Sequence, residues 1–276
     1  MIWKYKKIII FGLLAVGIAV LFIKFSGQKS IGIGTSRKGK QVKAEKIVNI
    51  SEKEKKDYLL DNPFTENNLM PFSVQSDTAI AFDVDTGEVY YAKNVDTKRP
   101  TASISKIMTA TIVLENIDTK ELLTVSKTAS EMIPNKIVMK EGEQLKVDDL
   151  LYGLMMISAN DAAEVLAEGT FDDRGRFIEK MNEKARWLEL KNTNFVTPSG
   201  MDDPDHYSTP YDLGVILRYA IRKNPEILKY MGTKEHSVFP TDHNESHWWQ
   251  HISGLLSSYQ GMDGAKTGFT WDAGNT

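Results

Sequence analysis

The sequence predicts an α/β domain in which strands come first, helices occupy the middle and strands return near the end. Two observations carry this prediction. Strand-like runs border a glycine-containing turn near residue 85, and four segments between residues 101 and 222 place apolar side chains at helical spacing. This order indicates a sheet with a helical insertion. The 276 residues suffice for one large domain, or for one domain and a tail, and contain no internal repeat.

Residues 1–26 predict a membrane anchor or a signal segment. Three lysines within residues 1–7 precede an uncharged run, Ile8–Ile23, which Lys24 closes. Its sixteen residues lie between a signal core of about 7–15 residues and a spanning helix of about 17–25. Because Phe25-Ser26-Gly27 is a poor cleavage site, we favour an uncleaved anchor with the bulk of the chain outside, and a secreted form is the alternative. Basic residues also follow the run, so this orientation depends on the chemistry expected below.

Residues 27–72 predict a polar linker, and residues 73–276 predict the folded domain. The domain begins with a hairpin, in which Thr78–Asp83 and Glu88–Lys93 flank Val84-Asp85-Thr86-Gly87. After Pro225 the pattern becomes irregular and strand-like up to Gly268. The expected helices are Thr101–Ile117, Val147–Glu168 with an interruption around Ser158, Arg174–Leu188 and Pro210–Arg222.

Composition excludes several kinds of function. The formal net charge of −3 gives no reason to expect nucleic acid as a partner. The chain has no cysteine, which excludes disulfides, a thiolate nucleophile and cysteine-ligated metals.

Ser103 and Lys106 are the first candidate catalytic pair. A helical pattern begins at or just before Ser103, where backbone N–H groups favour developing negative charge. Residues three apart share a helix face, so the Lys106 amine can reach the serine hydroxyl. Lysine becomes a base when burial and a second cation lower its pKa. Taken alone, the same residues are typical of an N-cap and an exposed helical lysine.

Ser158-Ala159-Asn160 is the second candidate motif, after the apolar run Leu150–Ile157. From a tight turn, a hydroxyl and an amide two residues apart can point the same way. The hydroxyl can then relay a proton while the amide holds a substrate carbonyl. A helix N-cap is the structural alternative, and both interpretations can hold together.

Lys266-Thr267-Gly268 is the third motif. A lysine beside a hydroxyl on a strand forms a carboxylate clamp, and the following glycine lets an extended peptide approach as an added strand. The alternative is a solvent-facing lysine beside a turn glycine.

Three histidines form a competing pattern. His243, His247 and His251 recur every four residues and could share a face that binds zinc. No HExxH motif accompanies them, and the polar residues between them argue against a stable helix. We therefore expect a polar, aromatic-rich loop, with no metal and no cofactor.

Together the motifs SxxK, SxN and KTG resemble the signature of penicillin-binding proteins and class A β-lactamases. The chain is most similar in pattern to the low-molecular-mass penicillin-binding proteins that are serine-type D-alanyl-D-alanine carboxypeptidases of the peptidase S11 kind, from about Asp77 onward. The stretches that carry this resemblance are Ala102–Thr109, Ser158–Ala163, Phe177–Ala185, Thr193–Gly200 and His206–Thr209.

The resemblance implies a penicillin-binding-protein/β-lactamase-like fold, with an antiparallel sheet and a helical insertion subdomain. It implies that Ser103 attacks the D-Ala-D-Ala bond of a peptidoglycan stem peptide and that Lys106 takes its proton. Ser158 would relay a proton to the leaving D-alanine, and Asn160 would hold the peptide. The implied partners are that peptide and β-lactam antibiotics, and the implied location is the extracytoplasmic face of a bacterial membrane.

The resemblance also assigns residues of the third motif. Lys266, Thr267 and Gly268 would bind the terminal carboxylate and the peptide backbone. The backbone N–H groups of Ser103 and Phe269 would form the oxyanion hole.

Two alternatives stay open. A class A β-lactamase needs a glutamate on a loop between the second and third motifs, and Glu189 is only a faint match. The family continues beyond the KTG strand through two more strands and a helix, whereas this sequence stops at Thr276. A truncated, catalytically incompetent fragment is therefore the other alternative, in which the KTG strand would have no sheet neighbour.

Overall fold

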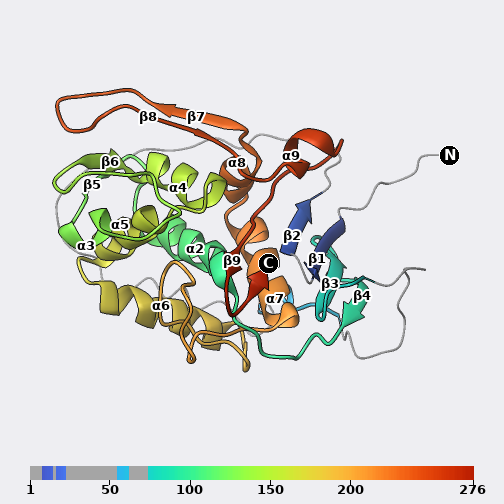
Figure 1. Cartoon of the computed structure of the whole chain (residues 1–276). Coiled ribbons are helices and arrows are strands. Elements are labelled where there is room, and N and C mark those ends of the chain that lie inside the picture. Colours follow the sequence, from blue (N-terminus) through green and yellow to red (C-terminus); the bar gives the residue numbers. More distant parts are fainter. Residues whose placement is uncertain (1–7, 15–16, 23–54, 62–73) are drawn as a thin grey trace, which may run out of the picture.

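A computed structural model of the chain describes residues 8–14, 17–22, 55–61 and 74–276. A four-stranded antiparallel sheet lies at one end of the molecule, with strand order β2-β1-β3-β4 (Figure 1). The predicted hairpin is confirmed, with a register shift after Ala81. The four strands are β1 (Ile8–Leu14), β2 (Gly17–Phe22), β3 (Ala79–Asp83) and β4 (Val89–Lys93).

The apolar N-terminal run differs from the predicted spanning helix or signal core. The structure divides it into β1 and β2, and β1 pairs with β3 from Ile8 opposite Asp83 to Gly12 opposite Ala79. A continuous apolar run rich in isoleucine suits a buried strand as well as a helix, and periodicity alone does not separate them. Among the residues that the structure describes, no helix is long and apolar enough to cross a membrane.

A short segment inside the range expected to be linker packs on the domain. Leu60 is buried in the core, and the Leu59 carbonyl accepts a hydrogen bond from Arg218 at 2.7 Å. The Tyr58 ring meets the edge of Tyr219, with 4.8 Å between ring centroids. The rest of the expected linker, residues 27–54 and 62–72, lies outside the described residues.

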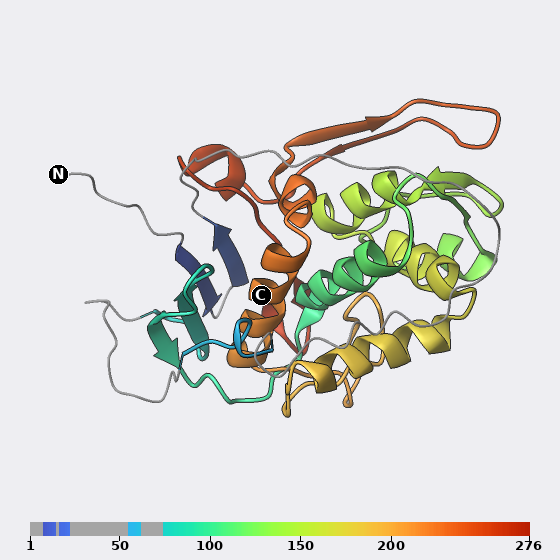
Figure 2. The ribbon, with the colours of Figure 1, turned by 180° about the vertical axis from the view of Figure 1, so that it is seen from behind.

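The predicted helical insertion is confirmed and forms the larger part of the molecule (Figures 1 and 2). Helix α2 runs through its centre, and every residue from Lys106 to Val113 is buried. A helix that is buried all round carries mostly apolar side chains, and its buried polar groups need partners. Thr109 and Thr111 find theirs in the carbonyls of Pro198 and Ile107. The other helices of this part are α3 (Lys127–Ser130), α4 (Val147–Met156), α5 (Asn160–Phe171), α6 (Arg174–Trp187) and α8 (Ile227–Gly232), and α2 itself spans Lys106–Asn116.

Helix α7 (Pro210–Lys223) lies between the sheet and the helical part (Figure 2). It begins as the sequence predicts, because the Thr209 side chain accepts a hydrogen bond from the Asp212 N–H and Pro210 occupies the first turn. Buried Arg218 on this helix donates to the carbonyls of Val84 and Asp85 in the turn between β3 and β4. The helix therefore fixes the sheet relative to the insertion.

Two small antiparallel strand pairs, which the sequence did not predict individually, border the helical part. One joins β5 (Leu122–Thr124) to β6 (Gln144–Lys146), and the other joins β7 (Glu235–Val238) to β8 (His247–Gln250). Helix α3 lies between the two strands of the first pair in the sequence, and the second pair is a hairpin. The β7–β8 hairpin reaches over α4 and the β5–β6 pair (Figure 1).

The last segment of the sequence returns on itself. After α9 (Leu255–Ser258), the KTG residues lead into β9 (Phe269–Thr270), which pairs with β10 (Gly274–Asn275). Gly268 and Thr276 exchange both backbone hydrogen bonds, at 2.8 and 2.7 Å. The expectation that the KTG strand lacks a neighbour is therefore wrong, because β10 reaches back far enough to pair with it.

Candidate active site

The chain forms a tight turn at the predicted nucleophile. Ser103 lies half-buried in a 3₁₀ turn, η1 (Ala102–Ser105), directly before α2. Ala102 has a φ of +44°, which non-glycine residues rarely adopt. Gly200 makes this turn possible, because a Cβ at that position would lie 1.8 Å from the Ala102 carbonyl oxygen.

The Lys106 amine lies at the centre of the site. Its Nζ is 2.8 Å from Ser103 Oγ, 2.8 Å from Asn160 Oδ1 and 2.6 Å from the Ser199 carbonyl oxygen. The side chain is fully buried. Burial, and next the charge of Lys266, hold the pKa of Lys106 well below its ordinary value. A neutral amine at hydrogen-bonding distance from a serine hydroxyl is able to accept its proton.

A second serine and lysine face each other across the site. Lys266 Nζ donates to Ser158 Oγ at 2.9 Å, and both residues are buried. Burial lowers the pKa of Lys266 to about 7. Ser158 breaks the chain between α4 and α5 with a φ of +62°, a conformation that costs a non-glycine residue about 1–3 kcal/mol. The helical interruption predicted around Ser158 is confirmed, and it aims the hydroxyl at the lysine.

Asn160 is oriented differently from the expectation. Its Nδ2 donates to the carbonyls of Ile133 and Pro134, both at 3.3 Å, while its Oδ1 accepts from Lys106. The amide nitrogen is therefore committed to the 133–134 backbone, and the oxygen holds the lysine. In this arrangement Asn160 orients Lys106, the candidate base.

The KTG strand closes one side of the serine. A Cβ at Gly268 would lie 2.8 Å from the Ser103 backbone nitrogen, so only glycine allows this approach. Because Gly268 and Thr276 exchange both hydrogen bonds, the next residue, Phe269, directs its N–H to the opposite side of the strand from β10. Half-buried Thr267 lies beside Lys266, and its carbonyl accepts from the lysine amine.

Sequence reasoning did not identify two supporting groups. The Ser199 carbonyl is the third group that accepts a hydrogen bond from the Lys106 amine. Thr109 on α2 holds the loop that contains Ser199, because its hydroxyl donates to the Pro198 carbonyl at 2.6 Å. Buried His206 donates through Nε2 to Ser105 Oγ at 2.7 Å, since its Nδ1 accepts from two backbone N–H groups. Burial lowers the pKa of His206 to about 4, so the ring is neutral at pH 7. Their only sequence signal is that both lie in stretches quoted for the family resemblance.

The histidines of the competing zinc pattern are separated. His247 on β8 contacts Glu143 at 2.6 Å, and His251 accepts from the Ser253 N–H. In residues 55–61 and 74–276 no group of three or more histidine, aspartate or glutamate side chains could hold a metal ion. Glu189, the faint β-lactamase match, is exposed just after α6.

Comparisons with known proteins agree with this geometry. The D-alanyl-D-alanine carboxypeptidase family, peptidase S11, matches residues 63–276. The chain belongs to this family. D-alanyl-D-alanine carboxypeptidase DacF of Bacillus subtilis is 33% identical over 204 residues, which cover 72% of this chain and 52% of the relative. The carboxypeptidase of Streptomyces sp. K15 is 36% identical over 204 residues, which cover 68% of this chain and 70% of that protein.

Solved structures in the family share the fold. The crystal structure of the Streptomyces K15 DD-transpeptidase superposes with a TM-score of 0.66 at 35% identity, covering 71% of this chain and 80% of that one. A Mycobacterium tuberculosis penicillin-binding protein homologue gives a TM-score of 0.66 at 32% identity, covering 72% and 75%. The predicted penicillin-binding-protein fold is thus confirmed. The chain spans about half the length of the B. subtilis and Haemophilus influenzae relatives that it matches.

Proposed function

We propose that the protein is a serine-type D-alanyl-D-alanine carboxypeptidase that shortens peptidoglycan stem peptides and is acylated by β-lactams. The observation that carries the proposal is the fully buried Lys106 amine, 2.8 Å from Ser103 Oγ and with a lowered pKa. Two buried lysines, each bonded to its own serine hydroxyl, suit a reaction that first removes and then returns a proton.

In the acylation step, Ser103 Oγ attacks the carbonyl of the penultimate D-alanine and its proton passes to Lys106. The carbon–nitrogen bond then breaks, and the leaving amine takes a proton from Ser158 Oγ, which Lys266 replenishes. D-alanine departs and the shortened peptide remains as an ester of Ser103. Water then attacks this ester and gives a proton through Ser158 to Lys266, which restores the proton that Lys266 lost. The ester bond breaks, Lys106 returns its proton to Ser103, and the cycle requires no cofactor.

Two groups stabilise charge in this proposal. The N–H groups of Ser103 and Phe269 form the oxyanion hole, supported by the close approach of Gly268 to the Ser103 nitrogen. Lys266 and Thr267 bind the carboxylate of the terminal D-alanine. A pKa near 7 for Lys266 in the free protein means that a bound carboxylate shifts it to the charged form.

Labelling with a fluorescent penicillin tests the proposal. We expect a stable label on Ser103 and release of D-alanine from a peptide that ends in D-Ala-D-Ala, with neither result in a Ser103→Ala control. A label that is lost within seconds indicates β-lactamase chemistry instead. A cooperatively folded chain that takes no label refutes the proposal.

We also propose that the domain acts outside the membrane, where it would contribute to cell-wall synthesis and cell shape. The proposed substrate supports this location, because peptidoglycan stem peptides lie outside the membrane. The lysine-flanked apolar run of residues 8–23 predicts a signal or anchor from the sequence alone, whereas the structure forms strands β1 and β2 from it. Protease treatment of intact cells that express the chain should digest the domain. Complete protection, with digestion only after lysis, would contradict export.

A further inference from the structure

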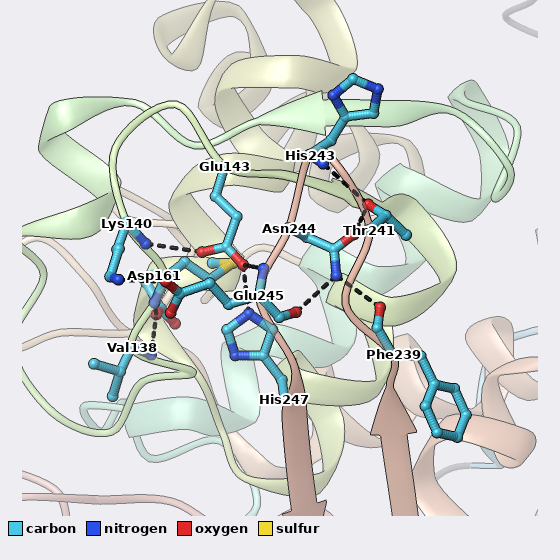
Figure 3. A network of polar contacts seen from close by, with 11 residues as sticks. Val138, Lys140, Glu143, Asp161, Phe239, Thr241, His243, Asn244, Glu245 and His247 are labelled. Atoms are coloured by element: carbon cyan, nitrogen blue, oxygen red, sulfur yellow. Dashed lines mark hydrogen bonds and ion pairs between the residues drawn. The ribbon is translucent and has the colours of Figure 1, made fainter.

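The β7–β8 hairpin carries a loop, residues 239–246, that is built to hold one shape. Asn244 Nδ2 donates to the carbonyls of Phe239 and Glu245 at 2.9 and 2.7 Å, and Thr241 Oγ1 bonds to Asn244 Oδ1 at 2.5 Å (Figure 3). The His243 N–H donates to Thr241 Oγ1 at 3.1 Å. These bonds give the loop fixed backbone groups to present to its neighbour.

That neighbour is Glu143, the residue before β6. Its Oε1 accepts from His247 Nε2 at 2.6 Å and from the Glu245 N–H at 2.9 Å, while its Oε2 accepts from the Lys140 N–H at 3.0 Å (Figure 3). Glu143 is only 7% exposed. Burial alone would raise the pKa of Glu143, but the His247 and backbone hydrogen bonds lower it below its ordinary value. The carboxylate therefore joins the hairpin to the segment before β6.

This segment, residues 133–143, is fixed at its other side by a second buried carboxylate. Asp161 Oδ1 accepts from the Ile137 N–H at 2.9 Å, and its Oδ2 accepts from the Val138 N–H at 2.9 Å. Val138 has a φ of +73°, which is a strained conformation for a β-branched residue. Such a conformation persists only where surrounding contacts impose it. Asp161 holds the Val138 N–H directly, and Glu143 holds the Lys140 N–H two residues further along.

The same segment holds the residue that orients the candidate base. Its Asn135 carbonyl accepts from the Asn160 N–H at 2.7 Å, and the carbonyls of Ile133 and Pro134 accept from Asn160 Nδ2. With Nδ2 engaged, Asn160 can present only its Oδ1 to Lys106. The hairpin is therefore connected to Lys106 through the hydrogen bonds of Glu143, the backbone of residues 133–143 and the hydrogen bonds of Asn160.

We propose that Glu143, held by His247 and the β7–β8 hairpin, is a positioning residue that acts on the acylation step through Asn160. The inference rests on the proposed function. It assigns a role to the histidine-rich β7–β8 hairpin, which contributes no residue to the predicted active site: the hairpin holds Glu143 in place. Glu143 itself touches none of the reacting groups, so its effect must pass through the amide.

A double-mutant cycle tests the coupling. Glu143→Gln keeps the side-chain shape but places an NH₂ group at one of the two oxygens that together accept from three donors. We expect the acylation rate constant for a fluorescent penicillin to fall about tenfold, as for the loss of one charge-assisted hydrogen bond. In an Asn160→Ser background, the same change should cost less than about twofold, because the coupled path is already broken. Glu235→Gln, on an exposed position of β7, is the matched control and should leave the rate unchanged.

The readouts separate positioning from stability. The final labelled fraction should equal that of the wild type, and the penicillin dissociation constant should stay constant while the rate constant falls. Equal losses in the two backgrounds, or a loss confined to the dissociation constant, would overturn the inference. If Glu143→Gln lacks cooperative unfolding, His247→Gln takes its place in the cycle, with the same criteria. Absence of label on the wild-type chain would instead refute the proposed function and so is distinguishable from failure of the coupling alone.

Discussion

Replacing Lys266 with methionine should stabilise the protein while removing its activity. Lys266 is fully buried, and burial lowers its pKa from 10.5 to about 7. That interval, at about 1.4 kcal/mol per pH unit, corresponds to a cost of about 4–5 kcal/mol to the folded state at pH 7. Methionine has a similar length and no charge. Its introduction leaves Ser158 Oγ without the lysine donor, which costs about 1–3 kcal/mol. The expected net gain at pH 7 is about 1–4 kcal/mol.

The stability gained by Lys266→Met should decrease as the pH rises above 7. Because the folded pKa of Lys266 lies below the unfolded pKa, the unfolded chain binds more protons between pH 7 and 10.5. Wild-type stability attributable to this lysine therefore rises as the pH rises through that window. The advantage of Lys266→Met shrinks in parallel. It reaches zero between about pH 8 and 10, where the remaining cost of burial equals the cost of the lost Ser158 hydrogen bond, and the variant is the less stable protein above that pH.

Urea denaturation of both proteins at pH 7, 8, 9 and 10 measures the effect. The control is Lys120→Met, which removes an exposed lysine from the loop after α2. Its free energy of unfolding should differ from that of the wild type by an amount that does not depend on pH. A Lys266→Met difference that is constant over the series would refute the argument that burial of this amine is what destabilises the fold. Penicillin labelling of the variant should be strongly reduced at every pH.

Three further changes test the geometry of the serine. Lys106→Met should reduce acylation by at least about 10³-fold with the fold retained, because the candidate base is lost; unchanged labelling would exclude that role. Gly200→Ala should lower the free energy of unfolding by more than about 2 kcal/mol, since its Cβ would collide with the Ala102 carbonyl, and urea denaturation measures this loss. Gly268→Ala should slow labelling of Ser103, because its Cβ would displace the strand from the serine. Expressed as a free energy, the loss in labelling rate should exceed the loss in the free energy of unfolding, and both are measured on one preparation.

Local patterns in the sequence predicted the elements and the motifs well. The break at Ser158 and the start of α7 at Pro210 follow from short-range rules, and the structure has both. The prediction for the apolar N-terminal run was wrong about its secondary structure. β1 forms by pairing with β3, which lies some 70 residues further along the chain, and local periodicity carries no information on that pairing.

The orientation of side chains within the site was less predictable. Asn160 has an amide that could point either way, and the carbonyls of Ile133 and Pro134 decide it. The Ser199 carbonyl carries no side-chain signature at all. Such backbone acceptors can be identified only when the fold brings distant segments together. A sequence motif therefore indicates which side chains react, but not which backbone groups orient them.

The lysine contacts have a consequence for the order in which the chain folds. Lys106 bonds to partners 54 and 93 residues further along the sequence, and Lys266 bonds to a serine 108 residues before it. Contacts of such separation form late, because closing a long loop costs entropy before any bond compensates for it. A folding intermediate with α2, α4 and α5 already packed would still hold Ser103 without its full set of neighbours. Acylation by a penicillin during refolding should therefore lag behind the recovery of helical circular dichroism, and so report the last step of assembly.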